Sequence, residues 1–225
     1  MTKYVFLDTE TTNLDPDLGD LWEIATSVYN TTRPEDGDQE SWWQVRADMR
    51  YADPNATRIG GYYGRAVVLD KPVGQGVQLA CTDSITGRKG DLLGNYSAEQ
   101  IALELAKQLD GAIIVANNPA FDRRFIEKFL RENGQILTAS HRMEDIRVML
   151  TGYVHGRLSL MDGKVDEAFS PETAPYVQDW LAGATKTLAW EIVGVSQDPA
   201  TRHTALGDAR LVRDVFKAIT GGIKR

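Results

Sequence analysis

Two carboxylates near the N-terminus follow a short apolar run. In the stretch FLDTETTNLDP (residues 6–16), Asp8 and Glu10 are separated by one residue, and hydroxyl residues follow them. Residues i and i+2 of a strand face the same side, about 6–7 Å apart. Such carboxylates can share divalent cations, because Mg²⁺ prefers oxygen ligands. Alone, the pattern leaves three interpretations open: a metal site that cleaves nucleic acid, a phosphatase nucleophile with its acid partner, and a polar strand end.

A third carboxylate, Asp122, ends the stretch VANNPAFD (residues 115–122). It falls in the first turn of a predicted helix, where a negative charge interacts favourably with the helix dipole. The turn directly follows an apolar strand pattern, and α/β sheets place functional groups at such corners. Asp122 can therefore be either a ligand or a simple N-terminal helix charge.

A histidine and a fourth acid open the last predicted helix, in HTALGDA (residues 203–209). A histidine side chain can accept a proton from water at physiological pH. Asp208, five residues after His203, can supply another metal ligand. The alternative is a surface histidine beside an ordinary helical aspartate.

The surrounding pattern alternates strands and helices, which is typical of an α/β sheet. Three early strands are predicted to form an antiparallel meander. A capping box at Ser97 and Gln100 begins a helix, and Asn118 caps another that starts at Pro119 and ends at Gly134. The predicted strands are 3–8, 21–30, 40–48 and 112–118, and further helices are predicted at 177–184, 186–195 and 204–220.

Two stretches show no long periodic segment. Residues 49–95 are predicted to be an irregular, variable segment, with a hairpin around 77–89, and residues 157–175 are predicted to be a loop. Tyr62, Tyr63 and Arg65 lie in the irregular segment and are candidates for contacts to a strand end. No linker divides the chain, so residues 1–225 are predicted to form a single domain.

The composition narrows the possible partners. The chain has 225 residues, a net charge of −7 and one cysteine, Cys81. The negative charge argues against wrapping nucleic acid through many Lys and Arg contacts. It is compatible with an enzyme that holds one strand end at a metal-loaded acidic site, because bound cations invert the local electrostatics. One cysteine excludes an internal disulfide, and no 18-residue apolar run is present. We therefore expect a cytoplasmic protein without a membrane segment.

Together and in this order, the three motifs resemble those of the DEDDh (DnaQ-like) 3′–5′ exonucleases. FLDTETTNL is similar to the first motif of that family, VANNPAFD to the second and HTALGDA to the third. The resemblance covers most of the chain, but residues 49–95 only loosely. It implies a ribonuclease-H-like fold: a mixed five-stranded sheet flanked by helices, with the first three strands antiparallel and a short strand at Asp145–Met149.

The resemblance also implies a site and a reaction. Two divalent ions, Mg²⁺ or Mn²⁺, would be held by the four acids, and His203 would be the general base. The substrate would be a single-stranded 3′ end of DNA or RNA, cleaved to nucleoside 5′-monophosphates. Family members include dimers and polymerase partners. The metal-binding residues would be Asp8, Glu10, Asp122 and Asp208, and the substrate contacts would be Thr11, Thr12, Leu14 and Asn118.

One departure from the family lies in the first motif. Asn13 stands where the family often has Gly. Asn tolerates positive φ better than most residues. We therefore expect Asn13 to adopt a left-handed turn conformation.

Two other functions compete. FLDTETT echoes the D-x-D-x-T motif of haloacid-dehalogenase-like phosphatases, and GDARLVRD (residues 207–214) echoes their later acidic element. That family requires Asp where Glu10 stands, and it leaves Asp122 and His203 without roles. A non-catalytic module that binds nucleic-acid ends on the same fold is the other alternative. Degenerate family members lose acidic residues, whereas all four are present here.

Overall fold

A seven-stranded sheet forms the centre of the computed structural model, which describes residues 2–31, 37–81, 92–182 and 190–221. The strand order is β5-β4-β3-β2-β1-β6-β7. The strands are β1 (Lys3–Thr11), β2 (Leu21–Asn30), β3 (Gln39–Val45), β4 (Gln75–Leu79), β5 (Leu92–Ser97), β6 (Ile113–Ala116) and β7 (Met143–Asp145).

The sheet is mixed. Strands β1 to β5 pair antiparallel in sequence order, whereas β6 and β7 add parallel to β1 on its other side. The predicted antiparallel arrangement of the first three strands is confirmed. The predicted count of five strands is wrong, because β4 and β5 extend the antiparallel edge. Both are short, and each contains a glycine, which weakens the strand signal in a sequence.

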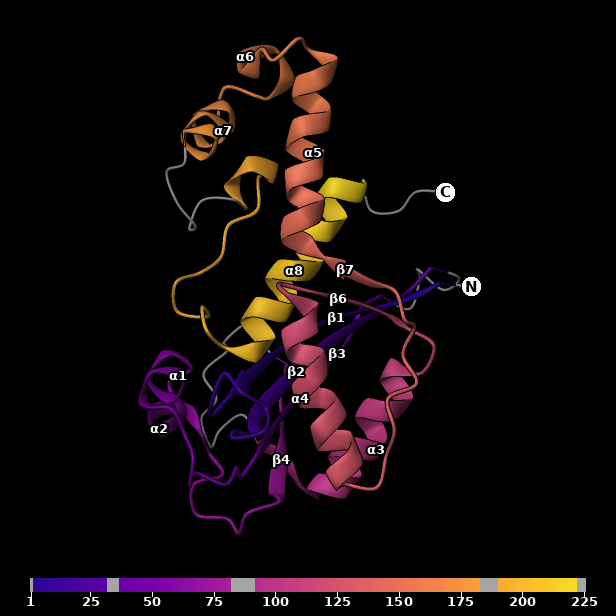
Figure 1. Cartoon of the computed structure of the whole chain (residues 1–225), viewed down its shortest axis with the longest axis vertical. Coiled ribbons are helices and arrows are strands. Elements are labelled where there is room, and N and C mark those ends of the chain that lie inside the picture. The colour runs from indigo at the N-terminus through magenta and orange to yellow at the C-terminus, as the bar shows by residue number, and fades with distance from the viewer. Residues whose placement is uncertain (1, 32–36, 82–91, 183–189, 222–225) are drawn as a thin grey trace.

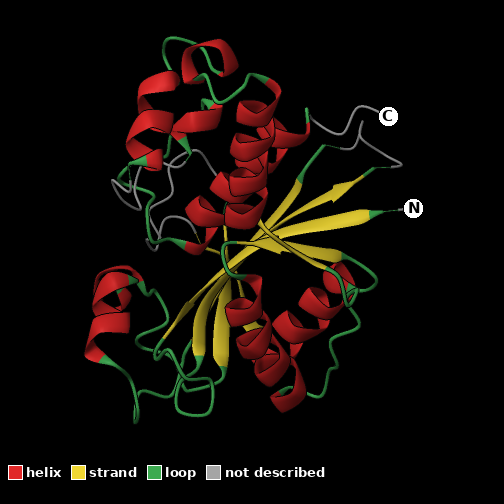
Figure 2. Ribbon diagram, turned by 45° about the horizontal axis from the view of Figure 1, so that its top comes forward, coloured by secondary structure: helices red, strands yellow, loops and turns green. Residues whose placement is uncertain are grey.

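Helices cover both faces of the sheet (Figure 2). The pair α3 and α4 packs on one face, and α8 lies against β1 and β2 on the other. The helices are α1 (Pro54–Ile59), α2 (Tyr62–Arg65), α3 (Ala98–Leu109), α4 (Pro119–Glu132), α5 (Ile146–Leu160), α6 (Val165–Ala168), α7 (Ala174–Leu181) and α8 (Ala205–Thr220), with a 3₁₀ turn at Glu191–Val193. The predicted capping box at Ser97 is present at the start of α3.

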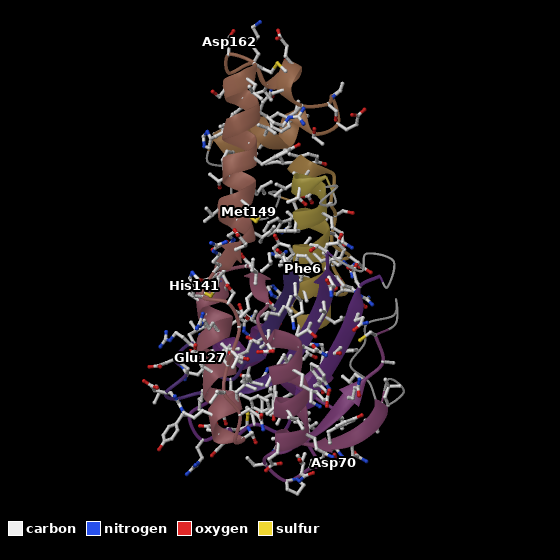
Figure 3. All side chains as sticks on the ribbon, turned by 90° about the vertical axis from the view of Figure 1, so that its right-hand side faces the viewer. Phe6, Asp70, Glu127, His141, Met149 and Asp162 are labelled. Carbon is white, nitrogen blue, oxygen red and sulfur yellow. The ribbon has the colours of Figure 1, made fainter. Side chains whose placement is uncertain are left out.

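The alternation of side chains along β1 decides which face each motif residue joins. Val5 and Leu7 are buried under α3 and α4, whereas Phe6 packs on the α8 side, 5.2 Å from the ring of Phe216 between centroids. Figure 3 shows Phe6 beside α8. Because side chains alternate along a strand, Asp8 lies on the α8 side with Phe6. The first acidic pair is thus directed toward the helix that carries the third motif.

A helical lobe of α5, α6 and α7 occupies most of residues 146–181, so the loop predicted at 157–175 is wrong. The short strand predicted at Asp145–Met149 is shifted, because β7 spans Met143–Asp145. Strand β7 ends at Asp145, whose carboxylate accepts a hydrogen bond from the Arg147 backbone N–H and begins α5. Helix α5 continues to Leu160, because apolar residues spaced by four form one buried face with α6 and α7. The lobe projects beyond the sheet (Figure 1), with Asp162 at the opposite end of the molecule from Asp70 (Figure 3).

Three further expectations concern residues 49–95 and 177–195, which the structure describes only in part. The irregular segment contains α1, α2 and two strands, so the prediction of irregular structure is wrong for much of 49–95. Strand β4 pairs with β5 rather than within the predicted hairpin at 77–89, and residues 82–91 are not described. The predicted helices at 177–184 and 186–195 run into residues 183–189, which are also not described. In the part of the chain that the structure describes, no helix is long and apolar enough to cross a membrane.

The core beneath α3 can be tested with two leucines of that helix. Leu105 is fully buried against the sheet, whereas Leu103 is 42% exposed. We expect Leu105→Ala to lower the free energy of unfolding by about 2–5 kcal/mol, because it leaves a cavity. The matched variant Leu103→Ala should change it by less than about 0.5 kcal/mol. Urea unfolding monitored by circular dichroism would measure both, and equal effects would contradict this packing.

Candidate metal and nucleic-acid site

Three carboxylates from two elements converge at one end of β1. Oxygen atoms of Asp8, Glu10 and Asp208 all lie within 4.8 Å of one another. Thr204 caps α8 by accepting a hydrogen bond from the Gly207 N–H at 3.0 Å, which places Asp208 in the first turn. The expected juxtaposition of the first and third motifs is therefore present, and the three acids could hold a divalent cation.

Burial and mutual repulsion perturb these acids. Burial, followed by the negative charges of Asp208, Asp122 and Glu10, raises the pKa of Asp8 well above its ordinary value. Burial and the charge of Glu23 do the same to the pKa of Glu10, although Arg65 opposes the shift. Burial also raises the pKa of Asp208. The ionised cluster therefore lacks compensating positive charge, which a divalent cation would supply.

Asp122 lies beside this cluster but is engaged in other bonds. Its side chain is 2% exposed, and one carboxylate oxygen accepts hydrogen bonds from the backbone N–H of Thr9 at 3.0 Å and from its hydroxyl at 2.7 Å. Burial outweighs these bonds and raises the pKa of Asp122 to about 7. Asp122 is close enough for its charge to raise the pKa of Asp8, yet it is not one of the three acids whose oxygens gather.

One cavity of about 130 Å³ is lined by His203 together with Asp8 and Asp208. The side chain of His203 is exposed, and its charge lowers the pKa of Asp208. The backbone of His203 has a φ of 59°, a left-handed conformation that costs free energy in a residue other than glycine. The cavity is lined by Asp8, Asn117, Arg147, Trp190, Gln197, Arg202, His203, Asp208, Leu211 and Val212.

Seven of these lining residues were not predicted as site residues, and four of the seven are polar. The side-chain amide of Gln197 donates to a carboxylate oxygen of Asp208. Arg147 and Arg202 are exposed cations at an acidic cavity. The side-chain oxygen of Asn117 is buried and, among the described residues, has no hydrogen-bond partner. Of these four, only Asn117 carried a signal, because it lies within the second motif; the other three lie outside the three motifs.

The loop after β1 holds the predicted substrate contacts. The Thr11 hydroxyl donates to the Asn13 carbonyl at 2.7 Å, and the Thr12 hydroxyl accepts from the Asp20 N–H at 2.9 Å. These two threonines are buried and shape the loop, whereas Leu14 is 67% exposed. The predicted left-handed conformation of Asn13 is wrong, since its φ is not positive. Its amide instead fixes the loop by donating to the Tyr51 carbonyl at 2.8 Å.

Asn118 is exposed at the start of α4. It is the N-cap residue of α4, as predicted, but it has a φ of 67° and its side chain makes no capping hydrogen bond. Pro119 suits the first helical position, because the N–H that proline lacks would have no intrahelical partner there. The left-handed turn at Asn118 leaves its side chain free near the second motif, and its contact to substrate stays a prediction.

The aromatic and arginine residues of α2 divide into buried and exposed groups. Tyr62 is fully buried, and Arg65 forms an ion pair with the buried Glu23 at 2.9 Å. The predicted direct contact of Tyr62 with a strand end is therefore wrong. The Arg65 side chain is 18% exposed, and its predicted contact stays a prediction. Tyr63 is 71% exposed, and its contact stays a prediction.

Comparison with known proteins connects this geometry to one fold. No protein-family model matches the sequence, and the search of curated proteins gives no match. The structure is similar to a zinc-bound complex of E. coli exonuclease I with single-stranded DNA, with a TM-score of 0.57, 16% identity, and coverage of 100% of this chain and 42% of that chain. It is also similar to E. coli exonuclease I bound to a dT13 oligonucleotide, with a TM-score of 0.56, 14% identity, and coverage of 98% and 41%. The chain thus has the fold of exonuclease I and spans about two fifths of the length of those structures.

The raised pKa of Asp122 predicts how pH changes the stability of the metal-free protein. The folded state holds this proton up to about pH 7, against an ordinary pKa of 3.8. The stabilisation is therefore complete below the unfolded pKa and is lost as pH rises through the folded pKa. We expect the Tm of the metal-free protein to fall between about pH 4.5 and 7.5, and to fall less in Asp122→Asn.

Thermal unfolding in a metal chelator measures this effect. Glu132→Gln, at an exposed carboxylate of the same helix, is the matched control and should keep the slope of the unmodified protein. An identical pH dependence of Tm in Asp122→Asn and the unmodified protein would contradict the assignment.

Proposed function

We propose that this protein is a metal-dependent 3′–5′ exonuclease that hydrolyses terminal phosphodiester bonds of DNA or RNA. The observation that carries the proposal is the convergence of Asp8 and Asp208 with His203 around one cavity, with Glu10 completing the acidic cluster. Each motif belongs to a different part of the chain, and the fold is that of exonuclease I. A chance gathering of unrelated surface acids would not explain why residues of the first and third motifs meet on this fold.

The acidic cluster fits a divalent metal centre. Its ligand atoms are all carboxylate oxygens, which suit Mg²⁺ and Mn²⁺. The raised pKa values of Asp8 and Glu10 indicate a site that is incomplete without positive charge. Asp8, Glu10 and Asp208 would hold the ions, with Asp122 at the edge of the site. Ions held by these residues would supply the chemistry needed for phosphodiester hydrolysis, activation of water and stabilisation of the leaving oxygen.

His203 supplies the general base in this proposal. Its imidazole is exposed at the cavity that Asp8 and Asp208 line. In its neutral form it accepts the proton of the attacking water. The neighbouring carboxylate of Asp208 stabilises the imidazolium that results, consistent with the favourable interaction between the two charges. Release of nucleoside 5′-monophosphates follows from attack at the terminal phosphodiester.

The substrate class follows from the surroundings of the cavity. Arg147 and Arg202 line it and supply positive charge for the phosphates of a strand. Leu14 presents an exposed apolar surface for a terminal base. The cavity is too small for a duplex, so we propose a single-stranded 3′ end as substrate. The solved complexes of exonuclease I with single-stranded DNA support the same substrate class.

The phosphatase alternative accounts for fewer residues. It assigns roles to Asp8 and to acids of α8, but none to His203, which lies at the same cavity. A non-catalytic module would not require an exposed histidine beside an acidic cluster. The exonuclease proposal gives each of these groups a function.

The main test is digestion of matched single-stranded DNA and RNA carrying a 5′ label, with Mg²⁺ or Mn²⁺ present. We expect 3′ shortening and release of mononucleotides. His203→Ala should lower kcat by about 100-fold or more, because general-base catalysis contributes that much. Asp8→Ala should abolish detectable Mn²⁺ binding in calorimetry.

The matched control is His141→Ala, which removes an exposed histidine that does not line the cavity. Its rate should equal that of the unmodified protein. Intact DNA and RNA after incubation with the unmodified protein would rule out the proposed function. Release of inorganic phosphate without loss of nucleotides would favour the phosphatase instead.

Leu14 provides a test of substrate binding. Leu14→Ala removes apolar surface at the proposed base contact, so KM for a short single strand should rise about threefold to tenfold with kcat nearly unchanged. Leu160→Ala, which removes a leucine that is 81% exposed at the end of α5, is the matched control. Equal KM values for both variants in steady-state assays would remove Leu14 from the binding surface.

A further inference from the structure

A half-buried arginine, Arg65, connects α2 to the loop that carries His203. The Arg65 guanidinium donates to both carboxylate oxygens of Glu23, at 3.0 and 2.9 Å, and to the backbone carbonyl of His203 at 3.0 Å. It also donates twice to the carbonyl of Gly60, at 3.0 and 2.6 Å. Arg65 therefore binds two backbone segments and one carboxylate at the same time.

Glu23 holds the other side of the His203 loop. It is fully buried on β2, and one of its oxygens accepts a hydrogen bond from the Ala205 N–H at 3.0 Å. Arg65 and Glu23 thus contact the backbone on either side of Thr204, which caps α8. The two anchors fix the chain where it passes from the left-handed conformation of His203 into the helix.

The same pair borders the acidic cluster. Glu23 and Glu10 are cross-strand partners, and their charges interact. A Cβ at Gly60 would lie 2.5 Å from a Glu10 carboxylate oxygen, so any other residue at this position would displace that carboxylate. Because Arg65 holds the Gly60 carbonyl, it fixes the backbone that packs against Glu10.

A bulge in the sheet lies beside Arg65 and involves Trp22. The register of β1 and β2 shifts between Glu10 and Thr11, which leaves Trp22 without a partner on β1. A bulge redirects the extra side chain. The Trp22 ring packs edge-on against Tyr62 at 5.1 Å, and the Arg65 guanidinium lies 5.1 Å from the centre of the Trp22 ring.

We infer that Arg65, together with Glu23, is a positioning residue for the reaction, acting through the backbone of His203 and the wall beside Glu10. The inference rests on the proposed exonuclease function. It also changes the role of α1 and α2, which belong to the site rather than to a variable segment. A strained left-handed residue persists only where its surroundings over-determine it, and Arg65 and Glu23 supply those constraints.

The geometry requires arginine rather than any cation. One planar guanidinium reaches three acceptor groups in different directions, whereas the ammonium of lysine is a compact point charge without this fork. Arg65→Lys therefore keeps the positive charge opposite Glu23 but cannot hold Gly60 and His203 together. The variant separates the effect of charge from that of positioning.

The first measurement is steady-state hydrolysis of a short single-stranded substrate at saturating Mn²⁺. We expect Arg65→Lys to lower kcat by about 100-fold, the cost of misplacing a catalytic group by about 1 Å. KM should change by less than about twofold, because no substrate contact is removed. Arg213→Lys is the matched control, since Arg213 has a side chain of similar exposure, 15% against 18%, and pairs with Glu40. It should retain the activity of the unmodified protein.

The second measurement does not depend on activity. The chain has three histidines, so NMR resolves the imidazole of His203 from those of His141 and His155. Arg65→Lys should shift the His203 resonances and leave the other two unchanged. If the unmodified protein digests no nucleic acid but this shift occurs, the proposed function fails and the positioning role stands. If the unmodified protein is active and the variant retains both its kcat and its His203 resonances, the inference is overturned.

A second variant, Glu23→Gln, tests the same inference if Arg65→Lys does not fold. Glu23→Gln keeps an oxygen that can accept from Ala205 but weakens the pair with Arg65. We expect a smaller loss of kcat, and the double variant should be no worse than Arg65→Lys alone, because the residues act as one unit. Additive losses in kcat would show that Arg65 and Glu23 act separately and would contradict the inference.

Discussion

Repulsion among gathered carboxylates is the constraint on which the rest of this structure depends. Asp8, Glu10 and Asp208 share a space of a few ångströms, and Asp122 lies near enough to raise the pKa of Asp8. Holding such charges together costs free energy that the surrounding fold must offset. The large apolar clusters on both faces of the sheet supply that stability. A divalent cation bound at this cluster would relieve the repulsion.

The sheet and α8 make this arrangement possible. Alternation along β1 directs its buried apolar residues to both faces and its acidic pair toward α8. The cap at Thr204 sets the start of α8, so that Asp208 meets β1 rather than solvent. Small changes in either element would separate the acids. Arg65 and Glu23 hydrogen-bond to the backbone on either side of Thr204, and these bonds hold the start of α8 in place.

Much of the architecture was predictable, because its signals are local. Strands β1 to β3 and helices α3, α4 and α8 follow from apolar periodicity, caps and proline position. Strands β4 and β5, the last two on one side of the sheet, were missed because they are short and contain glycine. The lobe was missed because a family pattern was given more weight than the spacing of Ile146, Leu150, Val154 and Leu158. That four-residue spacing is itself a local signal for a helix.

The sequence by itself determined which acids and which histidine are available. It also determined that Asp8 and Glu10 lie on the same strand and face the same side of it. Only the tertiary structure decided how they are used. It placed Asp8, Glu10 and Asp208 together, bonded Asp122 to Thr9, and paired Arg65 with Glu23. The physical reason is range: strand alternation acts over two residues, whereas Arg65 and the carbonyl of His203 are 138 residues apart. No local pattern encodes that contact, because the packing of α2 and α8 on the sheet creates it.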